Sequence, residues 1–437
     1  MRNMPEIDKN ICGALHTIDP WTKNSLLSQT YDFLSCLDEA RRSQDIELSS
    51  EKDSLAQQVH DHLDILMKMV FDSTKDIDLC LQDSIPYLFG THIVETHKLS
   101  GWGGAPVLLI SGDNIKLVVK VFEQSTKTKH WYKLHKEAFS LNFVNKLDVL
   151  EHASFPKLLG LSVCSFKDAG FILLYQEFIE GDTLKSYIEE IKNHPSNTES
   201  RKLALEEASN VMLLFGKGLR EFHYVKSIQN LEPIPKATLN LYKNIASEAI
   251  TKLKRIGAQI DLTKLQELFE ARLTEVEQHQ SILGITHGDA HFDNFLIQKT
   301  GNQAHLKIID VIFVYDSLDS GLKPTGLAAR DYFFTTNFYF NLMELIYAKI
   351  GHKTLTKQER EILINNISLG YGDAIPITQM KKFKDFFLLL EHLLLIKRSF
   401  DRHLTAENCD DEDKMEKYFC AGTMIVLDRI KKDVNDF

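Results

Sequence analysis

The sequence predicts an α+β protein of two lobes, in which a five-stranded antiparallel sheet with one helix precedes a largely helical lobe. Between residues 85 and 178, short apolar runs are separated by turn residues, which is the pattern of strands. On either side of this stretch, apolar residues recur at the spacing of helices. A length of 437 residues is more than one small core holds, which favours two lobes and an added segment.

Composition narrows the class of protein. The chain is 43% hydrophobic and 26% charged, as in soluble globular proteins. A formal net charge of −10 gives no basic field for nucleic acid, so no nucleic-acid partner is expected. Six scattered cysteines without a Cys-x-x-Cys pair favour free thiols in a reducing cytoplasm. No apolar run has the length of a signal peptide or membrane span, so we expect a cytoplasmic protein without a transmembrane segment, and secretion by a dedicated system stays open.

Residues 1–84 are expected to form an N-terminal helical extension. Leucines and a tyrosine recur at helical spacing between residues 26 and 37, and a second apolar face runs from Leu55 to Val70. The extension contains no catalytic pattern. A cap that packs on the next lobe is the favoured interpretation, and a segment that docks a partner is the alternative.

Residues 85–178 are expected to form the first lobe. Strands are predicted at 93–99, 107–110, 116–122, 155–163 and 170–179, with one helix at 128–147. The turn after the first strand contains Gly101, Gly103 and Gly104. Such a turn either joins strands or lets backbone N–H groups approach phosphates.

Lys120 lies within an apolar strand, where a buried lysine is costly unless it is paired, although such strands also carry outward lysines. Glu137, on the inward face of the following helix, is its best acidic candidate, and Glu123 is the alternative. The same helix has a basic start between Lys127 and Lys136. A solvated face is the simpler interpretation of these charges, and contact with a polyanion or lipid headgroup is the alternative.

Residues 179–437 are expected to form a helical lobe. An amphipathic helix at 206–223 precedes an insertion at 224–284, which should hold two helices at 237–256 and 262–280. The most apolar helical stretch, 386–396, is expected in the lobe core because it is too short to span a bilayer.

Polar residues gather between two apolar runs in the stretch 285–297. The stretch contains His287, Asp289, His291 and Asn294, and a second apolar run, 306–310, ends in Asp310. A hairpin of these two runs would bring Asp289, Asn294 and Asp310 to one point. One aspartate at a substrate hydroxyl, with an asparagine and an aspartate on Mg²⁺, is the minimal set for phosphoryl transfer from a nucleotide.

The pattern His-Gly-Asp-x-His-x-x-Asn followed by Ile-Ile-Asp resembles the signature of the aminoglycoside phosphotransferase and choline kinase family. The resemblance implies a bilobal protein-kinase-like fold with ATP and Mg²⁺ as cofactors. It implies that Asp289 orients the acceptor hydroxyl and takes its proton, while Asn294 and Asp310 ligate Mg²⁺. It also implies that Lys120 holds the nucleotide phosphates and that Glu137 holds Lys120.

Other roles follow from the same resemblance. The glycine turn would cover the phosphates, and backbone groups of Glu177, Phe178 and Ile179 would form a hinge that binds adenine. His287 and His291 would fix the catalytic loop by hydrogen bonds rather than transfer protons, because Asp289 already fills the base role. The family aspartate that braces this loop corresponds to Asp331.

The sequence departs from the family pattern after Asp310. Many relatives have an acidic residue two positions later, where this chain has Ile312. Asp316 and Asp319 follow further along, so a second metal ligand is left open.

These observations predict an ATP- and Mg²⁺-dependent phosphotransferase that acts on a hydroxyl of a small molecule, such as an amino alcohol, an aminoglycoside or a sugar. A protein or phosphoinositide kinase of the same fold is one alternative. A catalytically silent nucleotide-binding module is another, and the complete set of Lys120, Asp289, Asn294 and Asp310 argues against it.

Overall fold

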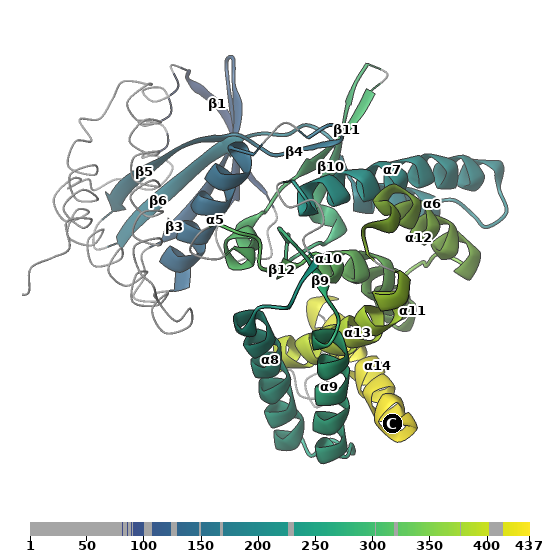
Figure 1. Ribbon diagram of the computed structural model, residues 1–437. Helices are drawn as coiled ribbons and strands as arrows, with labels where there is room; N and C mark the ends of the chain where they lie inside the picture. The colour runs from purple at the N-terminus through teal and green to yellow at the C-terminus, as the bar shows by residue number, and fades with distance from the viewer. Residues whose placement is uncertain are drawn as a thin grey trace, which may run out of the picture.

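The elements of this computed structural model form two unequal parts (Figure 1). The first part is a five-stranded antiparallel sheet with one packed helix, and the second consists mostly of helices. This confirms the α+β fold class and the two-lobed, protein-kinase-like arrangement expected from the sequence. The described residues are 81, 85, 89, 91–99, 107–123, 129–147, 150–166, 169–225, 231–301, 303–318, 322–375, 377–401 and 414–437.

The first sheet has the strand order β1-β2-β3-β6-β5, and each neighbouring pair is antiparallel. All five strands lie where the sequence predicts them, and β5 begins three residues later than expected. The short strand β4 precedes β5 in the chain and belongs to another sheet. The strands are β1 (Ile93–Leu99), β2 (Val107–Gly112), β3 (Lys116–Glu123), β4 (Ala153–Ser154), β5 (Leu158–Phe166) and β6 (Ala169–Glu177).

Alternation along β3 decides what each face of the sheet contacts. Leu117, Val119 and Val121 pack in one cluster with Leu81 and Ile85, which lie four residues apart in helical backbone. The other face packs against helix α5 (Lys129–Asn145), where the single helix is predicted. Successive strand residues point to opposite faces, so Lys120 lies on the α5 side. Helical backbone continues past the expected boundary at residue 84, and that boundary stays a prediction.

The helical part begins after β7 (Asp182–Thr183) with α6 (Leu184–Asn193) and α7 (Glu199–His223). The predicted insertion helices correspond to α8 (Lys236–Arg255) and α9 (Leu262–Glu277), and both pack against α13. They are therefore part of the lobe core. The later helices are α10 (Ala329–Phe333), the π-helix η3 (Phe334–Met343), α11 (Glu344–Lys349), α12 (Lys357–Tyr371), α13 (Ile377–Asp401) and α14 (Lys414–Asp436).

Two small sheets are formed by short strands that lie between the helices in the chain. A four-stranded sheet has the order β4-β11-β10-β7, and a three-stranded one has the order β12-β9-β8. The short helix η1 precedes β10, η2 follows β11, and η4 follows α12. No helix in the described ranges is long and apolar enough to cross a membrane. The remaining elements are β8 (Leu231–Glu232), β9 (Ser281–Gly284), η1 (Phe292–Asn294), β10 (Phe295–Thr300), β11 (Gln303–Ile308), η2 (Ile312–Ser317), β12 (Gly326–Leu327) and η4 (Gly372–Ala374).

Helices α7 and α12 cross with their backbones in contact. A Cβ atom on Gly216 would lie 2.3 Å from the carbonyl oxygen of Ile367, and one on Gly370 would lie 2.2 Å from that of Leu213. Only residues without a Cβ permit this approach. Gly370 lies in the last turn of α12 and Gly216 about two turns before the end of α7, so the crossing holds the ends of both helices, with His223 and Tyr371, near each other.

Replacing Gly216 by alanine is therefore expected to destabilise the fold by about 1–3 kcal/mol, the usual cost of overpacking, despite the better helix propensity of alanine. The measurement is urea unfolding followed by circular dichroism. Leu203→Ala is the control, since Leu203 is exposed on the same helix. Equal midpoints for Gly216→Ala and the wild type would contradict the close crossing.

His392 of α13 introduces a pH dependence into the core. It is 1% exposed, and neither ring nitrogen has a hydrogen-bond partner among the described residues. Burial, with the charges of Arg429 and Arg272, lowers the pKa of His392 from 6.5 to about 3. Below pH 6.5 the unfolded chain therefore binds a proton that the folded chain does not, and stability is lost as the pH falls toward 3.

His392→Leu is expected to stabilise the protein by about 2 kcal/mol more at pH 5 than at pH 8, because leucine has no proton to bind. Urea unfolding at both pH values measures this difference. The exposed residue Leu369 gives the control, Leu369→Ala, which involves no ionisable group and should change stability equally at both values. A pH-independent effect of His392→Leu would refute the assignment.

Candidate active site

The predicted hairpin forms, and it brings the two polar ends together. Strands β10 and β11 pair antiparallel from Phe295 with Ile308 to Thr300 with Gln303. Just outside the Phe295–Ile308 pair, the backbone N–H of Ile309 donates to the carbonyl oxygen of Asn294 at 3.0 Å. Asn294 therefore lies opposite the residue that precedes Asp310, as the sequence predicts.

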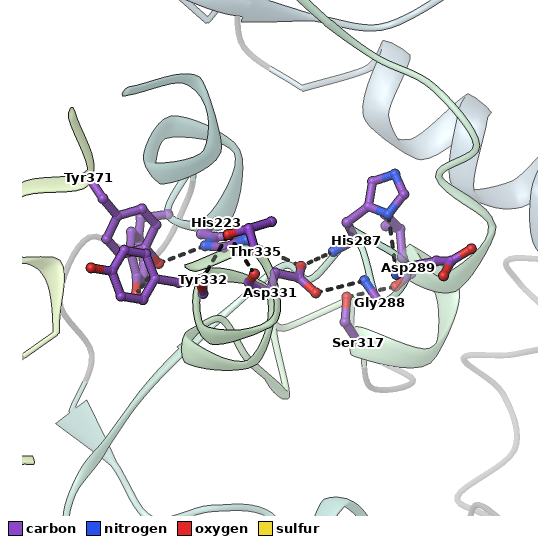
Figure 2. Close-up of polar contacts among 11 residues, drawn as sticks. His223, His287, Gly288, Asp289, Ser317, Asp331, Tyr332, Thr335 and Tyr371 are labelled. Carbon is purple, nitrogen blue, oxygen red and sulfur yellow. Dashed lines mark hydrogen bonds and ion pairs between the residues drawn. The ribbon is translucent and has the colours of Figure 1, made fainter. Parts of the chain in front are cut away.

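The loop before this hairpin is held by a buried carboxylate of helix α10. Asp331 accepts the backbone N–H of His287 at 2.5 Å through Oδ2 and that of Gly288 at 3.1 Å through Oδ1 (Figure 2). Gly288 has a φ of +76°, and a Cβ atom there would lie 2.6 Å from the Cβ atom of Phe313. The turn thus needs glycine for both its conformation and its space.

His287 connects the loop to the end of β11. Its ring is buried, and Nε2 lies 2.8 Å from the carbonyl oxygen of Ile309, which can only accept. Nε2 therefore carries the proton, and Nδ1 accepts the backbone N–H of Asp289 at 3.3 Å. With both nitrogens engaged by backbone, His287 supports the structural role expected for it.

Asp289 is turned toward His291, whose Nε2 atom lies 3.0 Å from Oδ1. Burial raises the pKa of Asp289, but the hydrogen bond and charge of His291 outweigh burial and bring it to about 2. The carboxylate is therefore ionised at neutral pH, with about a third of the side chain exposed. Phe334 packs edge-on against the His291 ring at 5.1 Å between centroids and limits its rotation.

Lys120 forms ion pairs with both Glu137 of α5 and Asp310 of the hairpin. Burial lowers the pKa of Lys120, but the two carboxylates overcome this and raise it above its usual range. The positive charge of Lys120 in turn lowers the pKa of Asp310. Asp310 has a φ of +58°, a left-handed conformation that is uncommon outside glycine and concentrates at functional sites.

The oxygen atoms at this point suit a hard divalent cation. Lys120 contacts Oδ1 of Asp310, and the carboxylate has a second oxygen. Asn294 donates through Nδ2 to the carbonyl oxygen of Asp289 at 2.9 Å, which turns Nδ2 inward and leaves Oδ1 as an acceptor. A carboxylate and an amide oxygen, with oxygens of bound phosphates, are the ligand set that Mg²⁺ prefers. These residues therefore fit the metal expected from the sequence.

The structure says less about the other residues that are predicted to contact the nucleotide. Gly101, Gly103 and Gly104 lie outside the described residues. Glu177 ends β6, and its backbone N–H donates to the carbonyl oxygen of Lys157 at 2.9 Å. Phe178 and Ile179 continue in irregular backbone toward β7, so they are the better placed of the three hinge residues. The adenine-binding role of the hinge stays a prediction.

The segment after Asp310 packs on helix α5, which the sequence did not indicate. Ser140 donates its hydroxyl to the carbonyl oxygen of Ile312 at 3.2 Å and accepts the N–H of Tyr315 at 3.0 Å. Lys136 lies 2.6 Å from Asp316 and is buried, so it does not belong to the basic surface considered for a polyanion. The other basic side chains of that surface lie outside the described residues.

Comparisons with known proteins give only distant structural likenesses. No protein-family model matches the sequence, and no curated protein matches it. Among solved structures, a Plasmodium vivax ethanolamine kinase is 15% identical with a TM-score of 0.43 and covers 91% of this chain and 99% of its own. An aminoglycoside phosphotransferase mutant is 9% identical with a TM-score of 0.47 and covers 80% and 96%. An aminopropanol kinase associated with a microcompartment is 13% identical with a TM-score of 0.43 and covers 82% and 98%.

These likenesses are distant and do not identify a substrate for this chain.

The turn at Gly288 gives a test with a matched control. Gly288 and Gly301 both have positive φ, but a Cβ atom at Gly301 would meet nothing within 4 Å. Gly301→Ala should therefore cost only the backbone strain of about 1–2 kcal/mol and leave nucleotide turnover unchanged. Gly288→Ala should in addition displace Phe313 and lower turnover at least about tenfold, since small misplacements are costly in catalysis.

Turnover is measured with Mg²⁺-ATP at matched folded fractions. Equal turnover of the two variants would show that the contact with Phe313 does not shape the loop.

Proposed function

We propose that this protein is an ATP- and Mg²⁺-dependent phosphotransferase that moves the γ-phosphate to a hydroxyl group of a small molecule. The convergence of Lys120, Glu137 and Asp310 carries this proposal. A buried lysine from the sheet, a glutamate from its helix and an aspartate after the hairpin meet at one point. This is the constellation that kinases use for nucleotide phosphates and metal.

Each residue of the chain has a distinct role in the proposed reaction. Lys120 binds the nucleotide phosphates and is held in place by Glu137, which shares its burial. Asn294 and Asp310 hold Mg²⁺, which supplies positive charge against the phosphate oxygens when it is bound. Lys120 also pairs with Asp310, so this carboxylate would be shared between the lysine and a bound metal.

Asp289 orients the acceptor hydroxyl and takes its proton. His291 holds the carboxylate at 3.0 Å, and the loop backbone is fixed from behind by Asp331. Little covalent chemistry is required of the protein, so positioning and charge neutralisation supply most of the rate. The side chain of Asp289 is partly exposed, which gives an acceptor access to it.

The choice of a small-molecule acceptor rests on the resemblance of the catalytic motif. An amino alcohol, an aminoglycoside or a sugar-like compound is the proposed class. Transfer to protein or phosphoinositide would use the same residues, so product mass separates these possibilities. Nucleotide binding without turnover would leave a silent binding module.

The proposal is tested by following transfer from γ-labelled ATP with Mg²⁺ to a panel of hydroxyl metabolites, aminoglycosides, inositides and lysate proteins. Asp289→Asn should lower kcat by about 10²–10⁴, the contribution of a general base, with nucleotide affinity nearly unchanged. Asp310→Ala should abolish the Mg²⁺-dependent part of nucleotide binding.

Asp293→Asn is the matched control, because Asp293 lies on η1 beside the loop and pairs with Lys185 instead. It should retain wild-type turnover. Wild-type rates in Asp289→Asn would overturn the assignment of the site.

A further inference from the structure

A line of buried hydrogen bonds extends behind the catalytic loop, away from Asp289 (Figure 2). It starts at the carboxylate of Asp331, which is 2% exposed. Besides the two loop N–H groups, Oδ2 of Asp331 lies 3.3 Å from Nε2 of His223. Burial raises the pKa of Asp331, but its hydrogen bond with His223 and the positive charge of Arg330 outweigh burial and lower the pKa. Asp331 is therefore an anion that can only accept hydrogen bonds.

Because Asp331 can only accept hydrogen bonds, it decides which nitrogen of the His223 ring carries a proton. Nε2 must carry a proton to donate to the carboxylate. The other nitrogen, Nδ1, lies 2.7 Å from the hydroxyl of Tyr371. In the neutral ring Nδ1 accepts, so the Tyr371 hydroxyl donates to it. Burial raises the pKa of Tyr371 well above 10, which keeps this hydroxyl protonated.

The line ends at a second tyrosine, whose hydroxyl lies 3.2 Å from that of Tyr371. This residue, Tyr224, follows His223 at the end of α7 and is only partly buried. Burial raises its pKa to about 12, so it also carries a proton. Donors therefore follow one direction, from Tyr224 through Tyr371 and His223 to Asp331.

Packing gives this line a fixed geometry. Tyr371 ends α12, which crosses α7 at Gly216 and Gly370 with backbones in contact. The Tyr332 ring lies 4.7 Å from that of Tyr371 and limits its movement. The carbonyl oxygen of His223 accepts the N–H of Ile285 at 3.0 Å, two residues before His287. His223 thus contacts the loop segment both through its backbone and through Asp331.

We propose that His223 and Tyr371 are positioning residues of the catalytic loop, which act through Asp331 on the backbone of His287 and Gly288. Tyr371 holds the ring at Nδ1 in the orientation in which Nε2 donates to Asp331. Nε2 then holds Oδ2 of Asp331 at the distance that accepts the loop N–H. Neither side chain contacts the proposed nucleotide or acceptor positions, since both lie on the far side of Asp331 from Asp289 (Figure 2). Their catalytic consequence rests on the proposed function.

Tyr371→Phe removes one hydroxyl and keeps the ring. It should lower kcat about fivefold, the worth of one net hydrogen bond, with the KM for ATP unchanged. Hydrogen–deuterium exchange by mass spectrometry should show faster exchange in the peptide that contains residues 285–292. Tyr332→Phe is the matched control, because its hydroxyl contacts Ser368 at 2.7 Å instead of His223. It should change neither quantity.

Two substitutions of His223 separate its two hydrogen bonds. The amide nitrogen of glutamine reaches about as far as Nε2, so His223→Gln should keep a donor for Asp331 and most of the activity. The amide of asparagine replaces Nδ1 instead, so His223→Asn should lose that donor and lower kcat more than His223→Gln does.

Unchanged kcat and unchanged loop exchange in Tyr371→Phe would overturn the proposal. Faster exchange throughout α7 and α12 would also overturn it, because that pattern indicates a general loss of packing. If the wild type transfers no phosphate, the proposed function fails, and loop exchange still tests the positioning role. Faster exchange confined to the loop would then support positioning by itself.

Discussion

The buried negative charge of Asp331 is the constraint on which the catalytic half of the structure depends. A carboxylate removed from water costs several kcal/mol unless donors replace the lost hydration. Three donors do so, namely the N–H groups of His287 and Gly288 and the ring of His223. These groups come from a loop and from the end of α7, far apart in the sequence. Burying the charge therefore requires the loop conformation that presents Asp289.

A second buried charge joins the two parts of the fold. The alternation of β3 turns Lys120 toward α5, where solvent is excluded, so the lysine is stable only with anionic partners. Glu137 supplies one from the sheet part, and Asp310 supplies the other from the helical part. The pairing with Asp310 sets the sheet relative to the catalytic hairpin. In the proposed function, the same charges would bind phosphate and metal.

Local patterns in the sequence predicted most of the elements, and three residues proposed for the site, Lys120, Glu137 and Asp310, do lie together. Alternation identified the five strands, and the hairpin formed where two apolar runs flank the polar cluster. Signals that depend on tertiary structure were not visible. Helix α7 begins at Glu199, earlier than predicted, and its N-cap Thr198, which accepts the N–H of Arg201, is a local signal that the prediction missed. Strands of two residues such as β4 and β7 are too short to show a period.

The support behind the loop was missed for the same physical reason. His223 and Tyr371 are separated by 148 residues, and no local spacing links them. A glycine inside a helix, such as Gly216, indicates only a weaker helix until a second helix is seen to cross it. The segment after Asp310 was interpreted only from its departure from the family pattern. Its missing acidic residue left a second metal ligand open, and what no local pattern indicated is that this segment packs against Ser140 of α5.

The low pKa of Asp289 says what kind of catalysis the site can support. A general base is most effective when its pKa lies near the working pH, and a carboxylate with a pKa of about 2 is a weak base toward an alcohol. Phosphoryl transfer tolerates this, because its loose transition state needs little base strength and much alignment. In the proposed reaction, Asp289 would therefore contribute chiefly by orienting the acceptor. The hydrogen bonds that hold its loop, from Asp331 back to Tyr371, serve this alignment, whereas replacing Asp289 itself removes both the alignment and the base.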